Sequence, residues 1–314
     1  MDDNDRLKQR TAYLSIISNS ALVLMKLLVG LYIGAVSLIS EALHSGVDLL
    51  AALIAWLAVR KSVEPPDTEH DYGHGKFENL SAAVEALLIV AAAAAIVHEA
   101  VLGLLEGGGV PENLGYGVVI MLISIIVNLL VSRRLLTVAK ITHSQALEAD
   151  GLHLRADIWT SVGVLIGLFA MEVTGWAPMD AIIAIFVAGI IFREGWHMIR
   201  ASALELTDAS LPEEDEEKIG RILKSAPEVK GFHCLRTRRS GSYRLLDVHL
   251  LFDGNMHLAH VHAVCDELEG RIRKAFGGFD IVIHPEPAGL HEPENKVSRY
   301  EESKQNNSSS PCNT

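Results

Sequence analysis

The chain has 314 residues, 49% of them hydrophobic, with a mean hydropathy of +0.26. These values are high for a soluble protein, so membrane-spanning segments are expected. The net charge is −12, and the absence of a basic stripe excludes nucleic acid as a partner. The three cysteines, Cys234, Cys265 and Cys312, form no CxxC pair and indicate neither a disulfide framework nor a zinc knuckle.

Six apolar runs are long enough to cross a bilayer, for which about 20 residues are needed. Lys and Arg residues lie before the first run and at the end of the sixth. They also lie in the connection between the second and third runs and in that between the fourth and fifth, whereas the other three connections contain no Lys or Arg. By the positive-inside rule, the sequence predicts an integral protein of the bacterial inner (plasma) membrane with cytoplasmic N- and C-termini. The runs cover roughly residues 12–33, 37–59, 79–104, 114–136, 146–174 and 178–199.

The composition changes to that of a soluble domain from about residue 207. Ser210 followed by Glu213 predicts a capping box with Pro212 in the first turn, at the start of a helix that reaches about Ser225. The pattern then predicts two strands, a second helix and a last strand, at about 229–238, 243–252, 257–276 and 279–284. The order αββαβ indicates a small ferredoxin-like α+β domain.

The expected fold is therefore an α-helical membrane protein with six transmembrane helices, followed by a C-terminal cytoplasmic α+β ferredoxin-like (αββαβ) domain. The transport domain would cover residues 1–206, and the cytoplasmic domain would cover 207–290 and serve metal binding and dimerisation. The polar tail, 291–314, is expected to be disordered.

Two His-x-x-x-Asp repeats interrupt the apolar runs, His44 with Asp48 in the second and His153 with Asp157 in the fifth. Residues four apart share a helix face, so each repeat presents one imidazole and one carboxylate on the same side. An ionisable group inside a membrane helix is costly and indicates a functional site. At 1.5 Å per residue, both repeats lie about 10 to 17 Å from a face of a core about 30 Å thick, near the midplane.

Two nitrogens and two oxygens suit a tetrahedral divalent metal such as zinc. Antiparallel neighbouring helices could bring the four groups together at that depth. The alternative is that the two pairs are unrelated and are each satisfied within the bundle.

These repeats, the six spans and the αββαβ domain resemble the cation diffusion facilitator (CDF) family of metal–proton antiporters. Residues 66–78, PDTEHDYGHGKFE, are also similar to the family's loop between the second and third helices. The resemblance covers about residues 10–288. It implies that the transport site consists of His44, Asp48, His153 and Asp157.

The predicted preference for zinc depends on His44. Family members with His at this position are typically zinc-preferring, whereas bacterial members of broader metal range often have Asp there. The chemistry agrees, because two imidazoles favour borderline zinc over harder manganese or magnesium. Cadmium is expected to compete.

The resemblance implies two further metal sites. One lies in the loop and uses Asp67, His70 and His74, with Asp71 as an alternative carboxylate. A binuclear site in the cytoplasmic domain would use His233, His249, His262, His284 and Glu286. The alternatives are a solvated loop and a structural histidine cluster, and His257 and His260 are interpreted as surface residues.

The sequence thus predicts a homodimeric, proton-coupled antiporter that exports Zn²⁺ from the cytoplasm, with Zn²⁺ also as a regulatory ion and membrane lipid as its surroundings. Alternatives are a broader CDF exporter of Fe²⁺, Mn²⁺, Co²⁺ or Ni²⁺ and a membrane-anchored metal sensor or scaffold. An enzyme is not expected. A membrane zinc hydrolase would need a base near the metal, for which Glu41 is a modest candidate, and no HExxH motif is present.

Overall fold

The computed structural model describes residues 3–33, 36–106, 114–174 and 178–289. Within these ranges some side chains are not described, including those of Glu41 and His44. The chain separates into two units, Met1–Leu206 and Thr207–Thr314. The tail expected to be disordered, 291–314, lies outside the described residues.

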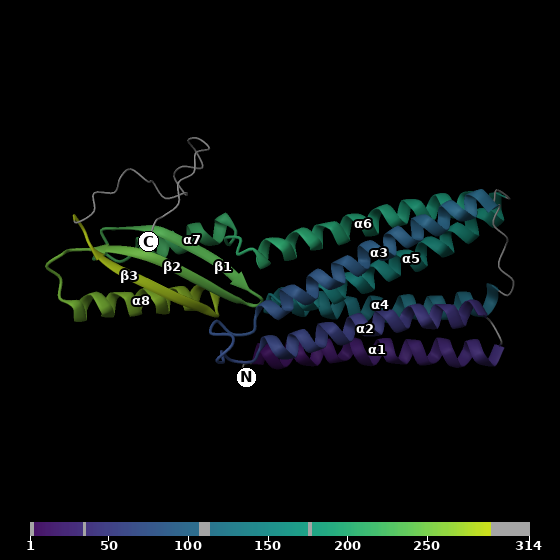
Figure 1. Cartoon of the computed structure of the whole chain (residues 1–314), viewed down its shortest axis with the longest axis horizontal. Helices are drawn as coiled ribbons and strands as arrows, with labels where there is room; N and C mark the ends of the chain where they lie inside the picture. Colours follow the sequence, from purple (N-terminus) through teal and green to yellow (C-terminus); the bar gives the residue numbers. More distant parts are fainter. Residues whose placement is uncertain (1–2, 34–35, 107–113, 175–177, 290–314) are drawn as a thin grey trace. The chain divides into compact units, whose positions relative to one another are not determined.

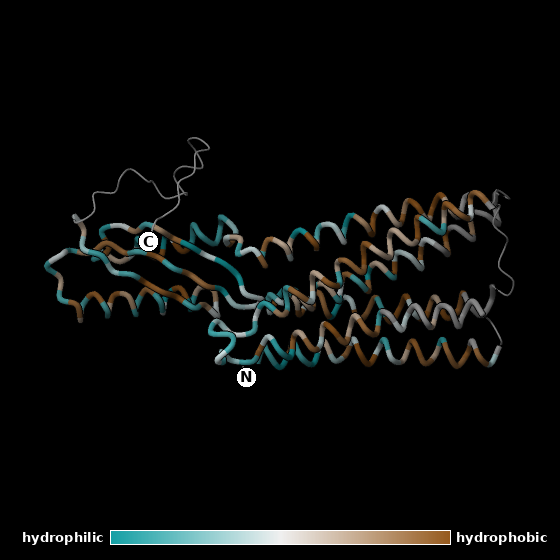
Figure 2. The backbone as a smooth tube through the Cα atoms, in the orientation of Figure 1, coloured by the Kyte–Doolittle hydropathy of each residue, from teal (hydrophilic) through white to brown (hydrophobic). Residues whose placement is uncertain are grey.

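The first unit is a bundle of long helices (Figure 1). Hydrophobic residues predominate along most of the coloured length of these helices (Figure 2). Within the described residues, α1, α3, α4 and α6 are long and apolar enough to cross a membrane, and the two helices that carry the HxxxD repeats are not among them. The six helices are α1 (Asp3–Ile33), α2 (Val36–Ser62), α3 (Lys76–Glu106), α4 (Leu114–Thr142), α5 (Gln145–Thr174) and α6 (Pro178–Leu206).

Helix α5 takes part in both apolar clusters of the bundle. Its residues Leu147 and Leu154 pack in a cluster with α1, α2 and α4. Ala149, on another side of the same helix, packs in a second cluster with α3 and α6. Residues of α5 are therefore enclosed from two sides, which explains how a polar residue such as His153 becomes buried.

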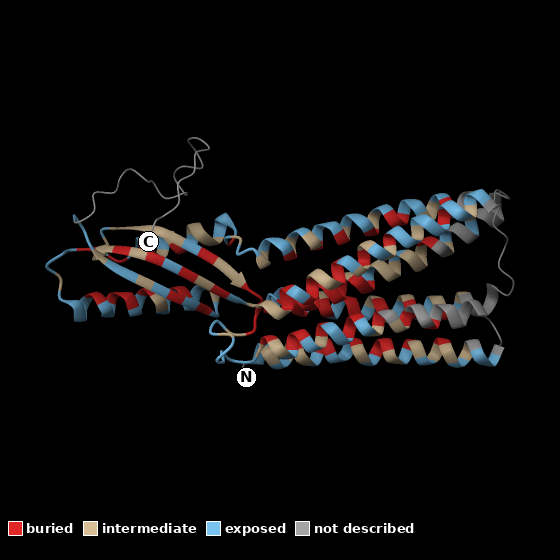
Figure 3. Cartoon of the chain, in the orientation of Figure 1, coloured by how far each residue is buried: buried red, intermediate tan, exposed pale blue. Residues whose placement is uncertain are grey.

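One end of the bundle is held by a buried carboxylate, that of Glu78. Buried residues gather at this end, which holds the N-terminus (Figure 3). Lys8 Nζ of α1 donates to Glu78 Oε1 over 3.1 Å, and Ser62 Oγ at the end of α2 donates to the same oxygen over 2.8 Å. The hydroxyl of Ser144, in the joint between α4 and α5, donates to Oε2. A single carboxylate from α3 thus connects α1, α2 and the α4–α5 joint.

The second unit is a three-stranded sheet with order β1-β2-β3, and the predicted αββαβ order is confirmed. Strand β2 pairs antiparallel with β1 and parallel with β3, and α8 makes the crossover. Alternate residues of β2, from Leu246 to Phe252, are buried against α7 and α8, so His249 points to the opposite face of the sheet. The elements are α7 (Glu213–Leu223), β1 (Gly231–Ser240), β2 (Tyr243–Phe252), α8 (Leu258–Phe276) and β3 (Phe279–Pro287).

The predicted capping box at the start of α7 is wrong. Pro212 occupies the N-cap position, and no side chain caps the helix. Four acidic residues fill the first turn instead, where negative charge is favourable beside the helix dipole.

The network around Glu78 yields a stability prediction. Lys8→Met leaves the buried Glu78 carboxylate without its cation, so we expect a loss of about 3–5 kcal/mol in stability. Adding Glu78→Gln removes the unpaired charge and should restore much of that loss. Thermal unfolding in detergent micelles measures both variants against Arg10→Gln, an exposed charge on α1. A double variant no more stable than Lys8→Met would contradict this account.

Candidate metal centres

The two HxxxD helices meet inside the membrane unit. Asp48 of α2 and His153 of α5 are both buried, and His153 Nε2 lies 3.2 Å from Asp48 Oδ1. Asp157, one turn further along α5, completes the group: one ligand atom from each of the three residues lies within 4.8 Å of the others. Helix periodicity brings His153 and Asp157 to the same face of α5. This is a compact set of one nitrogen and two carboxylate ligands.

His44 lies on α2 one turn before Asp48. Its side chain is outside the described residues, so its expected role as the fourth ligand stays a prediction.

A cavity of about 80 Å³ opens beside this group and is lined by Asp48 and Asp157. Its polar lining is incompletely satisfied: in the described part of the chain, Asn19 Nδ2, Ser124 Oγ and Asn128 Oδ1 have no hydrogen-bond partner. Buried polar atoms are normally paired, so such atoms indicate a place for an ion or water.

Lys26 also lines this cavity, and its Nζ donates to Ser45 Oγ over 2.7 Å. Lys26 is not among the site residues predicted from the sequence. The signal that could have found it is the cost of a buried lysine at membrane depth.

The loop between α2 and α3 forms a second group. Asp67 Oδ1 accepts hydrogen bonds from the backbone N–H of Glu69 and of His70, at 2.9 and 2.8 Å, which fixes a turn. These two bonds hold the pKa of Asp67 below its ordinary value. His74 Nε2 lies 3.2 Å from Asp67 Oδ2, and His70 Nδ1 lies 3.4 Å from Oδ1.

The histidines of this loop suit a metal. His74 is buried, and neither of its ring nitrogens makes a hydrogen bond within the described residues. His74 Nε2 faces the Asp67 carboxylate but makes no hydrogen bond with it, and a metal ion bound between the two would give this nitrogen a partner. The alternative carboxylate, Asp71, is exposed and lies outside the group of possible ligands formed by Asp67, His70 and His74.

Three histidines form a row across the face of the three-stranded sheet that is opposite α7 and α8. His233 of β1 is in register with His249 of β2, which is in register with His284 of β3. Neighbouring ring centroids are 5.0 and 4.8 Å apart. Residues in register on adjacent strands point to the same face, so the strand pairing itself assembles this row.

The carboxylate of Glu286 lies close to all three histidines. It follows His284 by two residues and so shares its face of the strand. Its carboxylate oxygens lie 2.9 Å from His233 Nε2, 2.8 Å from His249 Nδ1 and 3.5 Å from His284 Nε2. Burial alone would raise the pKa of Glu286, but the hydrogen bonds from His233 and His249 outweigh it, so the pKa lies below its ordinary value.

Cys234 joins this group although strand alternation would turn it toward the helices. Phe232 and Leu235 both pack against the core, three residues apart, and the register between β1 and β2 shifts between His233 and Arg236. Cys234 has φ of +51° in this bulge, a conformation that costs on the order of 1 kcal/mol for a residue with a side chain.

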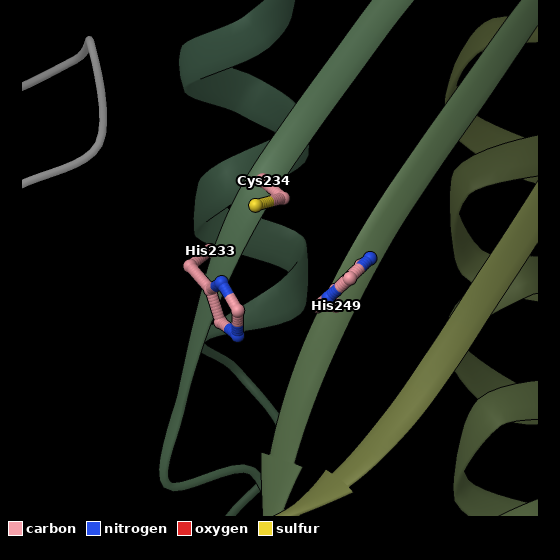
Figure 4. A group of neighbouring side chains, drawn as sticks. All are labelled: His233, Cys234 and His249. Carbon is pink, nitrogen blue, oxygen red and sulfur yellow. The ribbon is translucent and has the colours of Figure 1, made fainter. Parts of the chain in front are cut away.

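Figure 4 shows the result, with Cys234 beside His233 on β1 and His249 on the neighbouring strand. Ligand atoms of these three residues lie within 4.8 Å of one another. Cys234 is not among the site residues predicted from the sequence. The three-residue spacing of the core residues Phe232 and Leu235 around it is the signal that could have revealed it.

His262 is placed apart from the row. It lies on α8, is exposed, and its Nε2 is 3.7 Å from Asp266 Oδ2. Within the described part of one chain, the structure does not bring His262 to His233, His249, His284 and Glu286.

The chain matches families along most of its length. Residues 12–207 match the cation efflux transmembrane domain, and residues 211–288 match the cytoplasmic domain of cation efflux proteins. The cation-efflux pump FieF of Pectobacterium atrosepticum is 34% identical over 297 residues, which cover 92% of this chain and 97% of that protein. FieF of Klebsiella pneumoniae is 33% identical over 288 residues, covering 91% and 94%.

A solved structure of CzrB in its zinc form is 35% identical, with a TM-score of 0.25, and the match covers 26% of this chain and 96% of that chain. The family matches and the FieF relatives span both units described above, and the helices are apolar as an integral membrane protein requires. The chain therefore belongs to the cation diffusion facilitator family and is a cation-efflux transporter.

Proposed function

We propose that this protein is a proton-coupled antiporter that exports divalent metal, with Zn²⁺ preferred and Cd²⁺ as a competitor, from the cytoplasm. The single observation that carries the proposal is the meeting of Asp48, His153 and Asp157 between α2 and α5. His44 would supply the fourth ligand.

The charges of this group support a divalent ion as substrate. Two carboxylates balance the 2+ charge, which lowers the cost of holding the ion at membrane depth. The imidazole of His153, together with that of His44, would favour zinc over harder ions.

The same ligands provide the coupling to protons. A metal needs deprotonated ligands, so a proton and a metal compete for the group. Histidine suits such an exchange, because its ordinary pKa lies near physiological pH. We infer that metal enters from the cytoplasm, that the site then opens outward, and that inward-moving protons displace the metal.

The cytoplasmic domain would dimerise and respond to metal. The two overlapping groups of possible ligands share His249: one contains His233 and Cys234, and the other contains His284 and Glu286. The FieF relatives are cation-efflux pumps, which supports export as the direction of transport for this chain. The proposed orientation, with both termini in the cytoplasm, follows from the distribution of Lys and Arg.

Removal of a carboxylate from the proposed transport site should strongly reduce export. The assay is zinc uptake into everted vesicles with an imposed pH gradient, followed with a zinc-sensitive dye. Loss of a residue that only supports a metal ligand already costs about tenfold or more in metal affinity or activity. Asp157 is a proposed direct ligand, so Asp157→Ala should lower zinc uptake by at least about tenfold. Glu148→Gln, an exposed acidic residue of the same helix, serves as the control and should transport normally. Zinc uptake by Asp157→Ala equal to that of the unaltered protein would contradict the proposed transport site.

His44→Asp tests the preference for zinc. Replacing an imidazole by a third carboxylate hardens the site, so Mn²⁺ and Fe²⁺ should compete more strongly against zinc. Competition among metals for vesicle uptake, compared with the unaltered protein, gives the ratio. An unchanged order of metals would show that His44 does not set the selectivity.

Loss of the shared histidine should empty the cytoplasmic site. His249→Ala removes a ligand from both groups, so the full-length protein should bind fewer equivalents of zinc after dialysis, measured by elemental analysis. His257→Ala, at the N-cap of α8 and outside both groups, is the matched control. Equal zinc content in the two variants would contradict a metal site on the sheet.

A further inference from the structure

Cys234 is placed unlike a structural cysteine. A free cysteine usually behaves as a small apolar side chain and packs in a core. Cys265 of α8 does so, because it is buried among the apolar residues of the cytoplasmic domain. Cys234 is only half-buried, and it lies beside His233 and His249 (Figure 4). Its surroundings are therefore those of a metal ligand rather than those of a core residue.

The thiol of Cys234 and the two imidazoles form one compact group. One ligand atom from each of the three residues lies within 4.8 Å of the others. The sulfur and nitrogen ligands of a tetrahedral zinc ion lie about 2.0 to 2.3 Å from the metal. Atoms at the observed separation can therefore share one ion after small rotations of their side chains, and a fourth position remains for water.

Glu286 leaves one nitrogen of each imidazole available to a metal. Its carboxylate pairs with Nε2 of His233 and with Nδ1 of His249. Within the described residues, the second nitrogen of each ring makes no hydrogen bond. A carboxylate on one nitrogen fixes the orientation of an imidazole and makes its other nitrogen a better metal ligand. The position of Glu286 thus prepares both rings for an ion.

Sulfur distinguishes this group from the other candidate metal centres. Among the groups of possible ligands in the described part of the chain, the others contain only imidazoles and carboxylates. A thiolate favours soft and borderline ions such as Cd²⁺ and Zn²⁺, whereas Mn²⁺ prefers oxygen ligands. When the metal–sulfur bond forms, the S–H bond breaks and the proton passes to the solvent.

We propose that His233, Cys234 and His249 form a thiolate-containing site that binds the thiophilic ions Zn²⁺ and Cd²⁺ and discriminates against Mn²⁺. This inference rests on the metal site proposed above for the cytoplasmic domain, and it names the class of ion to which that domain responds. Cys234 then sets the selectivity of the response, and the intramembrane ligands set the selectivity of transport.

Cadmium reports a bond to sulfur directly. A cadmium–thiolate bond gives an ultraviolet charge-transfer band that bonds to nitrogen or oxygen do not give. In the full-length protein, Cys265→Ala and Cys312→Ala leave Cys234 as the only cysteine. This protein is freed of metal and titrated with Cd²⁺ in detergent micelles. We expect a band that grows and then saturates, and cadmium at the transport and loop groups should not contribute to it, because those groups contain no cysteine.

Histidine variants of the single-cysteine protein test the ligand set. His249→Ala should weaken the apparent cadmium affinity of the band by at least about tenfold, because loss of a residue that only supports a ligand already costs that much. His284→Ala is the matched control. The ring of His284 lies 4.8 Å from that of His249, but His284 is outside the group that contains Cys234. Its band should saturate at the same cadmium concentrations as that of the parent protein.

Cys234→Asn in the otherwise unaltered chain gives a second test that leaves Cys265 in place. Asparagine tolerates a positive φ better than most residues, so it suits the φ of +51° at this position. The variant should lose the charge-transfer band and keep the thermal unfolding temperature of the metal-free protein.

Competition tests the class of ion. Zn²⁺ should displace Cd²⁺ and remove the band of the single-cysteine protein. Mn²⁺ at the same concentration should leave the band in place. Equal displacement by the two ions would show that the site does not discriminate, and it would overturn the proposal.

Three further results would overturn the proposal. Cadmium bound by elemental analysis without a band shows that Cys234 is not a ligand. A band that His249→Ala does not weaken, or that persists in Cys234→Asn, shows only adventitious binding to a thiol. An equal loss in His284→Ala places the ion in the row of histidines rather than beside Cys234.

The vesicle assay separates this inference from the proposed export. Zinc uptake that persists in a protein without the band refutes the thiolate site alone. A band that persists in a protein without metal-gradient-driven or proton-driven uptake refutes the proposed transport function alone.

Discussion

Helix α5 packs against neighbouring helices on two of its sides. It contributes Leu147 and Leu154 to the cluster with α1, α2 and α4, and Ala149 to the cluster with α3 and α6. A helix enclosed in this way has little freedom to rotate without disrupting one cluster. The approach of His153 to Asp48 is a consequence of this packing, because α2 belongs to one of the clusters that orient α5.

Polar groups buried in the membrane unit gather in two places that differ in how they are satisfied. Around Glu78, each carboxylate oxygen accepts at least one hydrogen bond, from a lysine or a serine. Around Asp48 and Asp157, several lining atoms have no hydrogen-bond partner within the described residues. A satisfied network stabilises one arrangement of the helices, whereas an unsatisfied one favours an incoming ligand. The contrast distinguishes the structural joint at Glu78 from the proposed substrate site at Asp48 and Asp157.

Much of the fold, and the meeting of the two repeat-bearing helices at the candidate site, could be predicted from the sequence, because both follow from periodicity. Apolar runs of sufficient length predicted the six helices. The four-residue spacing within each repeat, combined with depth, indicated that Asp48 and His153 could meet, and the structure brings them to 3.2 Å. Features of the structure that have no regular sequence period were not predicted. Cys234 faces the histidines because a bulge interrupts the alternation of β1, and no periodic pattern contains a bulge.

Two other differences have local causes. The capping box at Ser210 failed because Pro212 holds the N-cap position itself. Lys26 was left outside the predicted site because a single buried lysine has no repeat to reveal its neighbours. Its position on the cavity wall depends on the packing of α1 along α2, which only the tertiary structure provides.

Glu286 has a consequence for the unfolded chain as well as for the folded one. It lies on β3, yet it contacts His233 of β1, a strand that is separated from β3 by β2 and stands 53 residues earlier in the sequence. A metal ion held by these residues would act as a reversible cross-link between the two edge strands. In the chain-entropy description, closing a loop of this length removes about 4 kcal/mol of conformational freedom from the unfolded chain. The abundance of metal around the domain would then set how tightly its edges are joined, much as redox conditions do for a disulfide.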